Sequence, residues 1–481
     1  MKWRLANRRR TGLWALLAVA LAGVIWLGWR AVDRHAIVAT SIPPRPGLST
    51  WPAELEDNIT QAEQAAGSYF HPVKGLIALS RLYHANGFYI EAMQCYAGLQ
   101  QIEPGEARWW HLQASILSSF GRLDEALPLE QKAVDLVPGY IAARLRLGDI
   151  LLKTNQTAGA IKAYAEVLDR DQGNPYALLG LAKCYIGGGD WNKARERLRQ
   201  SNKLHPDFIG GLSLMAMVAE HFGDQGEAEA LRAEIGRREF SDLADPWLDG
   251  LMEDCYDAYR LSVVAVVTTM AGDPAGARHL LERAIALAPE HSSYHRQLAV
   301  LLSQGVDSAA ARRHFEKAVA LSPRDVDSWL LLFQLLIKMG DVPAAELALT
   351  RGLVNCPDSP SLHMERARRW SSAGHTEEAI IEFREAYRLN PSEAQPLIEL
   401  ASALFSVGRG DEALGALHEA LKKQPDHPMA LATLTFYCIS AGDEAGALEW
   451  WKHVRRQPRT PEQTVTALKQ AFQQHFGRDP P

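Results

Sequence analysis

Residues 374–391 read GHTEEAIIEFREAYRLNP, and the spacing of small, aromatic and proline residues in this stretch recurs along most of the chain. Counting from Gly374, Ala379 follows after five positions, Phe383 after nine and Pro391 after seventeen. The glycine position returns every 34 residues, at Gly340, Gly374, Gly408 and Gly442. Self-similarity at such a period is typical of a helical solenoid.

Each period contains two helical segments. Ahead of Gly340, the apolar residues Trp329, Leu332, Phe333 and Leu336 return at intervals of three or four and mark one face of a helix. The glycine ends this first helix and permits a tight turn, and the proline near the end of the period stops the second helix. The small residue between them lets the two helices approach closely. One period therefore predicts one helical hairpin.

This pattern resembles the tetratricopeptide repeat, including the upstream Leu-Gly pair of that family at Leu147 and Gly148. The resemblance implies an all-α fold, a right-handed solenoid of about eleven 34-residue helical hairpins. It also implies an inner groove lined by the first helix of each hairpin, in which extended peptides or partner helices bind.

The hairpins fall into two arrays. We call each 34-residue period, counted from the start of its first helix, a frame. Frames that begin near residues 73, 107, 141, 175 and 209 give a first array of five repeats over residues 73–242. Six more frames give a second array over residues 258–461. Between them, residues 243–257 are an insert with an Asp245-Pro246 helix start and apolar residues at helical spacing. We expect one long helix from about 246 to 270 that joins the arrays rigidly. Its acidic residues either face solvent or form a docking patch.

Capping segments and a membrane anchor complete the organisation. Residues 53–72 and 462–481 are expected to cap the solenoid, the latter followed by a polar tail, and residues 30–52 form a Pro-rich spacer. Residues 11–29 carry no charge and are long enough for one transmembrane helix. The basic segment 1–10 places the N-terminus in the cytoplasm and the repeats in the periplasm, outside the inner membrane. A cleaved signal peptide is the alternative.

No segment of the sequence indicates a catalytic function. The sequence lacks the phosphate-loop, GxSxG and HExxH patterns, and its five cysteines show no metal-ligand spacing. We therefore predict no catalytic residue, cofactor, metal or small-molecule substrate. The formal net charge of −6 argues against a nucleic acid partner, because phosphate binding requires a basic surface.

The resemblance places groove residues at the second, fifth, ninth, twelfth and thirteenth positions of each frame. In the first array these give a mainly basic surface, with Lys74, Arg81, His84, Arg108, His111, Asp149, Lys153 and Lys183. In the second array they are mostly apolar, with Val266, Met270, Leu330, Ile337, Met364, Arg368, Phe405, Phe436 and Ile439. The basic half is expected to engage acidic peptides and the apolar half a hydrophobic segment. Alternatively, the charges are only solvated and the apolar residues pack between repeats.

These expectations describe a single-pass, membrane-tethered scaffold that binds protein partners and assembles an envelope complex. It resembles envelope proteins that tether such repeats beside a translocation, cytochrome-maturation or polysaccharide-export machine. A periplasmic holdase-like chaperone that uses the apolar groove of the second array is the main alternative. An enzyme hidden within the repeats is the third hypothesis.

Overall fold

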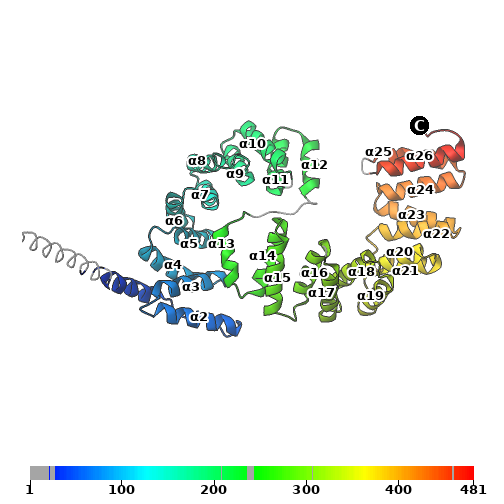
Figure 1. The fold of residues 1–481 in the computed structure, drawn as a ribbon. Coiled ribbons are helices and arrows are strands. Elements are labelled where there is room, and N and C mark those ends of the chain that lie inside the picture. Colours follow the sequence, from blue (N-terminus) through cyan, green and yellow to red (C-terminus); the bar gives the residue numbers. More distant parts are fainter. Residues whose placement is uncertain are drawn as a thin grey trace, which may run out of the picture. The chain divides into compact units, whose positions relative to one another are not determined.

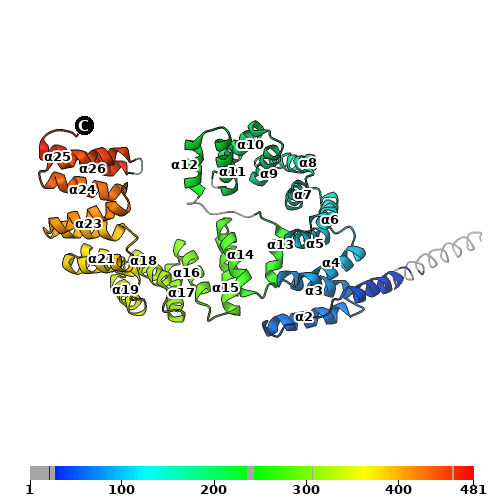
Figure 2. The same ribbon diagram turned by 180° about the vertical axis from the view of Figure 1, so that it is seen from behind.

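The computed structural model describes residues 28–206, 208–235, 243–305, 307–457 and 460–480, together with Leu21 and Trp26. Every regular element within these residues is a helix, which confirms the all-α solenoid (Figures 1 and 2). The chain divides into two compact units, residues 1–289 and 290–481.

The first unit contains five hairpins, the insert and a sixth hairpin. Its helices are α2 (Ala53–Ala66), α3 (Pro72–Ala85), α4 (Tyr89–Ile102), α5 (Ala107–Ser119), α6 (Leu123–Leu136), α7 (Ile141–Lys153), α8 (Thr157–Leu168), α9 (Pro175–Gly187), α10 (Trp191–Leu204), α11 (Ile209–His221), α12 (Gln225–Ile235), α13 (Pro246–Asp249), the 3-10 helix η1 (Gly250–Asp254), α14 (Ala258–Met270) and α15 (Pro274–Leu287).

The second unit contains five hairpins and a final helix. Its helices are α16 (Ser292–Gln304), α17 (Ser308–Leu321), α18 (Val326–Lys338), α19 (Val342–Asn355), α20 (Pro360–Ser372), α21 (Thr376–Leu389), α22 (Gln395–Ser406), α23 (Gly410–Lys423), α24 (Pro428–Ser440), α25 (Glu444–Arg456) and α26 (Glu462–Phe476). The eleven hairpins of the described chain begin at α3, α5, α7, α9, α11, α14, α16, α18, α20, α22 and α24.

A left-handed residue separates the two helices of nearly every hairpin. Gly340 has φ of 76°, and the corresponding glycines of nine of the eleven hairpins have φ between 72° and 84°. The third hairpin uses Asn155 at φ 60°, the only non-glycine residue with positive φ in the described chain. The corresponding residue of the seventh hairpin, Val306, lies outside the described residues. Glycine and asparagine are the residues that tolerate this conformation, so the period in the sequence locates the turns.

The helices of a hairpin cross at a fully buried alanine. All eleven positions are inaccessible to solvent: Ala92, Ala126, Ala160, Ala194, Ala228, Ala277, Ala311, Ala345, Ala379, Ala413 and Ala447. Four residues after this alanine, several of the second helices carry a large buried side chain, as at Phe315, Phe383 and Trp451. A small residue permits the two helices to approach closely, and the larger side chain fills the space beside it in the core.

A helix packs against each end of the repeats. Leu55, Ile59, Ala62 and Ala66 of α2 form a buried stripe against the first hairpin. At the other end, Leu468 and Phe472 of α26 are buried against the last hairpin. Terminal helices of this kind cover an apolar face that a repeat would otherwise expose.

The segment preceding α2 differs from the expected spacer. Residues 28–41 are helical, and the chain leaves regular structure only from Ile42, because the prolines that disfavour a helix begin at Pro43. Val38 and Ser41 are buried, and Gln94 of α4 donates to the carbonyl of Thr40. The segment therefore packs on the first hairpin instead of extending as a free spacer.

Most of the predicted transmembrane helix lies outside the described residues. Of residues 11–29, only Leu21, Trp26, Gly28 and Trp29 are described. Among the described residues, none of the helices combines the length and apolarity that a membrane crossing requires. The anchor stays a prediction from the sequence.

The prediction of one long helix over residues 246–270 is wrong. Helix α13 ends at Asp249, η1 follows, and Cys255 is extended before α14 starts at Ala258. The carboxylate of Asp257 accepts from the backbone N–H groups of Tyr259 and Arg260 and so caps α14. The carbonyls of the intervening segment are bound by arginine side chains from other helices, as described below, and not by a continuing helix.

We expect Gly340→Ala to destabilise the second unit and Gly415→Ala to stabilise it. Alanine at the left-handed φ of Gly340 costs about 1–2 kcal/mol, although the space around it is open. Gly415 lies in α23 with open space around its Cβ position, so the same change gains up to about 1 kcal/mol of helix propensity. Urea unfolding followed by far-ultraviolet circular dichroism measures both. A similar effect of the two substitutions would contradict the assignment of the turn.

Candidate functional site

The insert, residues 243–257, lies against the first helices of the first three hairpins. In both ribbon views α13 runs beside α5 (Figures 1 and 2). Side chains of α3 and α5 and residues in and just before α7 bind it at two ends, around Asp245 and around Asp254. We call this surface of α3, α5 and α7 the inner surface of the first unit.

Asp245 is the best-held residue of the insert. Its side chain is 2% exposed. Oδ2 lies 2.9 Å from Nε2 of His111 and accepts from Nε of Arg146, also at 2.9 Å. Oδ1 accepts from the hydroxyl of Tyr140 at 2.6 Å. Three side chains from α5, the loop before α7 and α7 itself therefore converge on one carboxylate.

The surroundings of His111 raise the pKa of its ring. Its ring is buried between two carboxylates, Asp245 on Nε2 and Glu130 of α6 at 2.7 Å from Nδ1. Burial disfavours the imidazolium, but the charge of Glu130 and the hydrogen bonds to both carboxylates outweigh it and raise the pKa of His111 to about 9. Burial acts against the carboxylate of Asp245 too, yet the hydrogen bonds from His111 and Tyr140 and the charge of Arg146 lower its pKa. Burial raises the pKa of Glu130, whereas the pKa of Asp245 is lowered, so Asp245 is the carboxylate whose ionised form the cluster favours beside the His111 imidazole.

Trp247 adds an aromatic contact two residues after Asp245. Its ring stacks on Tyr140 with centroids 3.7 Å apart and planes 12° apart, and its backbone N–H donates to the Tyr140 hydroxyl at 3.0 Å. The ring of His111 meets the indole edge-on at 5.5 Å. A carboxylate and an indole are therefore bound together by the same residues.

The other end of the insert is bound largely through its backbone. Arg81 of α3 donates to Asp254 Oδ2 at 2.6 Å and to the carbonyl of Gly250 at 2.8 Å. The amide of Asn86 donates to the carbonyl of Asp254 and accepts from the N–H of Tyr256. One arginine and one asparagine thus hold a segment that is not part of their own hairpin.

Two further arginines connect the sixth hairpin to the first. Arg260 of α14 donates to the carbonyls of His84 and Ala85 at the end of α3. Arg283 of α15 donates to the carbonyls of Met252 and Cys255 in the insert. The sixth hairpin is therefore tied to the first, which explains why the compact unit ends at residue 289 and not at the predicted end of the first array.

The predicted groove residues of the first array have four different fates. Arg81 and His111 bind the insert. His84 is buried against the hydroxyl of Tyr96, and burial and the charge of Arg260 lower its pKa to about 3, so it contributes no positive charge. Arg108 folds back on Glu106 at the start of its own helix. The remaining residues, Lys74, Asp149, Lys153 and Lys183, are exposed to solvent, as is the ion-paired Arg108.

The second-array residues are also only partly available. Phe436 is 54% exposed and Val266 is exposed, whereas Met364 and Ile439 are buried and cannot meet a partner. Arg368 pairs with Glu365 and Glu399. The half-buried positions are Met270, Leu330, Ile337 and Phe405, the last stacked on Tyr437 at 4.1 Å. Met364 and Ile439 therefore follow the alternative in which apolar residues pack between repeats, and Arg368 is engaged in ion pairs.

Sequence reasoning missed Tyr140, Arg146 and Asn86. Tyr140 and Asn86 lie in turns between helices, and Arg146 is one position beyond a groove position of its frame. The feature of the sequence that points to this surface is the group of acidic residues in the insert, which the sequence offers as a docking patch. Asp254 does dock, on Arg81, while Asp249 accepts from the N–H of Asp245 and Glu253 is exposed.

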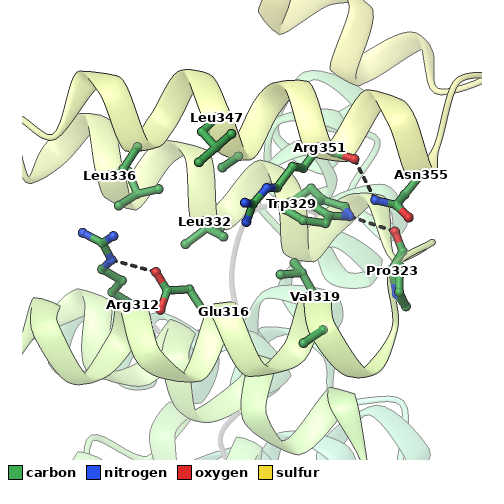
Figure 3. A pocket seen from close by; sticks show the side chains of 13 residues that line it. Arg312, Glu316, Val319, Pro323, Trp329, Leu332, Leu336, Leu347, Arg351 and Asn355 are labelled. Carbon is green, nitrogen blue, oxygen red and sulfur yellow. Dashed lines mark hydrogen bonds and ion pairs between the residues drawn. The ribbon is translucent and has the colours of Figure 1, made fainter.

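The second unit has a pocket of about 540 Å³ between the second helices α17 and α19 (Figure 3). Trp329, Leu332 and Leu336 of α18 form its apolar floor, and the Trp329 indole N–H donates to the carbonyl of Pro323 at 2.8 Å. Arg351 extends from α19 beside Trp329 (Figure 3). Such a pocket can take an apolar side chain of a partner. Within the described residues, histidine, cysteine and acidic side chains nowhere gather into a metal-binding cluster.

The helical hairpins of this chain match those of a known repeat family. A family model described as the tetratricopeptide repeat matches residues 155–218, 301–368 and 372–435, and a second with the same description matches 271–326. The chain contains tetratricopeptide repeats. Repeats of this family in general mediate protein–protein interactions.

Individual relatives are distant. The chain is 22% identical over 335 residues to the CTR9 homolog of Arabidopsis thaliana, covering 67% of this chain and 29% of the relative. It is 26% identical over 297 residues to the cellulose synthase operon protein C of Xanthomonas axonopodis, covering 57% and 19%. The chain thus spans less than a third of these relatives. Among solved structures, yeast Tom70 covers 84% of this chain and 96% of its own at 15% identity, with a TM-score of 0.37.

The attachment of the insert should weaken as the pH rises from about 6.5 to 9. The pKa of His111 is raised to about 9, so its contribution is complete below the unfolded value near 6.5 and is lost as pH passes about 9. Glu130 of the same hairpin accounts for part of this shift, so the insert loses only the part of the contribution that comes from Asp245. The fluorine NMR signal of 5-fluorotryptophan at position 247, followed during urea titration at several pH values, reports it.

His111→Gln should flatten this pH dependence, because glutamine carries no titrating charge. His363→Gln is the matched control, since His363 pairs with Glu382 across a hairpin of the second unit in the same way. That variant should leave the signal at position 247 unchanged. A pH dependence that persists in His111→Gln would rule out His111 as its source.

Proposed function

We propose that this chain is a non-enzymatic, membrane-tethered scaffold that binds segments of partner proteins on the first helices of its hairpins and assembles an envelope complex. The observation that carries the proposal is the exposure of Phe436 on α24, a first helix, with Met429 of the same helix also exposed. Large exposed aromatic residues are the usual anchors of protein interfaces.

The exposure pattern favours a dedicated scaffold over a holdase-like chaperone. A holdase needs a wide apolar surface for varied clients. In the second unit the first helices instead alternate exposed apolar residues with the Arg368–Glu399 ion pair and buried positions such as Met364. Localised anchors suit one partner segment better than many unfolded ones.

The N-terminal segment provides the tether in this proposal. Residues 11–29 form one transmembrane helix of the inner membrane, with residues 1–10 cytoplasmic and the repeats periplasmic. The sequence similarity to a protein of a cellulose synthase operon supports a machine that exports polysaccharide over the other envelope machines considered.

A photoreactive residue at Met429 should capture one recurrent protein in native membranes, and Phe436→Asp should abolish that capture. Loss of an anchoring aromatic weakens an interface by about 2 kcal/mol or more, roughly thirtyfold in affinity. The matched control is a photoreactive residue at Ile381, which is 64% exposed on the second helix α21 of the same unit. Mass spectrometry identifies the products. Equal capture at both positions, or many unrelated clients at Met429, would contradict the scaffold.

Alkaline phosphatase fused after residue 480 should be active, and green fluorescent protein at the same position should be dark. Replacing the basic residues before residue 11 with glutamine should reduce phosphatase activity, because these charges hold the N-terminus in the cytoplasm: Lys2, Arg4, Arg8, Arg9 and Arg10. Replacing Arg30 and Arg34 instead is the matched control and should preserve it. A fluorescent, phosphatase-inactive fusion of the unaltered chain would reverse the proposed topology.

A further inference from the structure

We propose that the inner surface of the first unit is a binding site for a peptide carrying a carboxylate followed two residues later by an aromatic ring, and that the insert occupies it as a tethered ligand. A partner segment with this pattern displaces the insert. The inference rests on the proposed role of the first helices in binding partners, and it gives one of their surfaces a ligand chemistry.

The contacts of the insert are those of a bound peptide. His111, Arg146 and Tyr140 converge on the Asp245 carboxylate, and the same tyrosine takes the indole of Trp247. Farther along, Arg81 and Asn86 bind carbonyl and N–H groups of the insert backbone, which any sequence provides. Pockets for selected side chains combined with backbone hydrogen bonds are the usual means of recognising an extended segment.

The second unit shows that a hairpin does not require such a segment. His363 of α20 pairs with Glu382 of α21 at a spacing of 19 residues, as His111 pairs with Glu130. The other ring nitrogen of His363 is satisfied by the carbonyl of Pro357 just before its own helix. In the first unit, the corresponding nitrogen of His111 is instead satisfied by a carboxylate 134 residues farther along the chain. The carboxylate is thus an added ligand of the hairpin and not a part of it.

A segment that replaces the insert must match the charges and the aromatic ring of the inner surface. Removing Asp245 would leave Nε2 of the buried His111 and the partly exposed guanidinium of Arg146 without the anion that they share, which is unfavourable even though Glu130 still pairs with Nδ1 of His111. A displacing segment must therefore bring a carboxylate of its own. The open face of Tyr140 then selects an aromatic ring two residues on.

A pocket beside the insert gives a competing segment its first contact. It has a volume of about 440 Å³ and lies where Asp254 and Tyr256 meet α2 and α3. Lys74 is exposed at its edge and has neither an ion pair nor a hydrogen bond within the described chain. A second acidic residue of the partner can pair with this lysine before the insert has left.

Because the insert belongs to the same chain, it competes strongly with any free peptide, and a test requires a variant in which the insert binds more weakly. A ligand on the same chain has an effective concentration in the millimolar range and gains a factor of 10² to 10⁴ over the same ligand free in solution. A free peptide therefore competes poorly with the insert of the unaltered chain. Weakening the insert removes that competition.

The experiment measures the binding of a fluorescent peptide of residues 243–256 to the full-length chain by fluorescence anisotropy. In the opened variant, Asp245→Asn with Trp247→Ala, we expect the peptide to bind at least 100-fold more tightly than to the unaltered chain. Adding His111→Gln to the opened variant should abolish binding, whereas adding His363→Gln should not. A peptide carrying Asp245→Asn should fail to bind any of them.

A second measurement covers the case in which the opened variant does not fold. Hydrogen exchange of residues 246–257 in the unaltered chain should accelerate at millimolar peptide, and not with the Asp245→Asn peptide. If the peptide neither binds a folded opened variant nor accelerates this exchange, the proposal is overturned. Concentration-dependent dimers of the unaltered chain that exchange their inserts would also overturn it, by making a second copy the occupant.

Neither measurement depends on Phe436 or on a membrane. A failure to capture a partner at Met429 would therefore leave the peptide result standing, and a failure of the peptide would leave the scaffold standing.

Discussion

The fold depends on one steric constraint, the close crossing of two helices at an alanine that leaves no room for solvent. This alanine is fully buried in every described hairpin, which leaves no room there for a larger side chain or for solvent. The left-handed residue five positions earlier sets the turn that brings them together. With both positions fixed, the remaining apolar residues of each helix face the next hairpin, and the other faces of the helices are left for partners.

The repeat pattern could be read from the sequence because its causes are local. A left-handed turn needs glycine or asparagine, a crossing needs a small residue, and a helix stop favours proline, so each leaves a mark within a single period. Asn155 illustrates this, since it takes the glycine position of its hairpin with φ of 60°. The caps were predictable for the same reason, as the stripe of Leu55 and Ile59 shows.

The binding surface could not be read in the same way, because it depends on pairing between distant segments. The basic residues of the first array and the acidic residues of the insert were both visible in the sequence, but nothing local showed that they bind each other. Asp245 pairs with His111 across 134 residues, and Arg81 with Asp254 across 173. The long helix predicted over 246–270 failed for the same reason: its carbonyls are taken by Arg81, Arg283 and Asn86, which helix periodicity does not include.

Stacked repeats ordinarily contact only their neighbours, so their stability is close to a sum of local terms. The insert changes this in the first unit. The insert binds α3 through Arg81 and Asn86 and α15 through Arg283, and Arg260 of α14 binds the end of α3 directly, so the first and sixth hairpins are coupled in stability. The second unit has the same His–Glu pair within one hairpin, completed by that hairpin's own backbone, and keeps Phe436 exposed on a first helix. The same repeat therefore gives two different surfaces: in the first unit the first helices are covered by a segment of the chain itself, and in the second unit Phe436 stays exposed on a first helix.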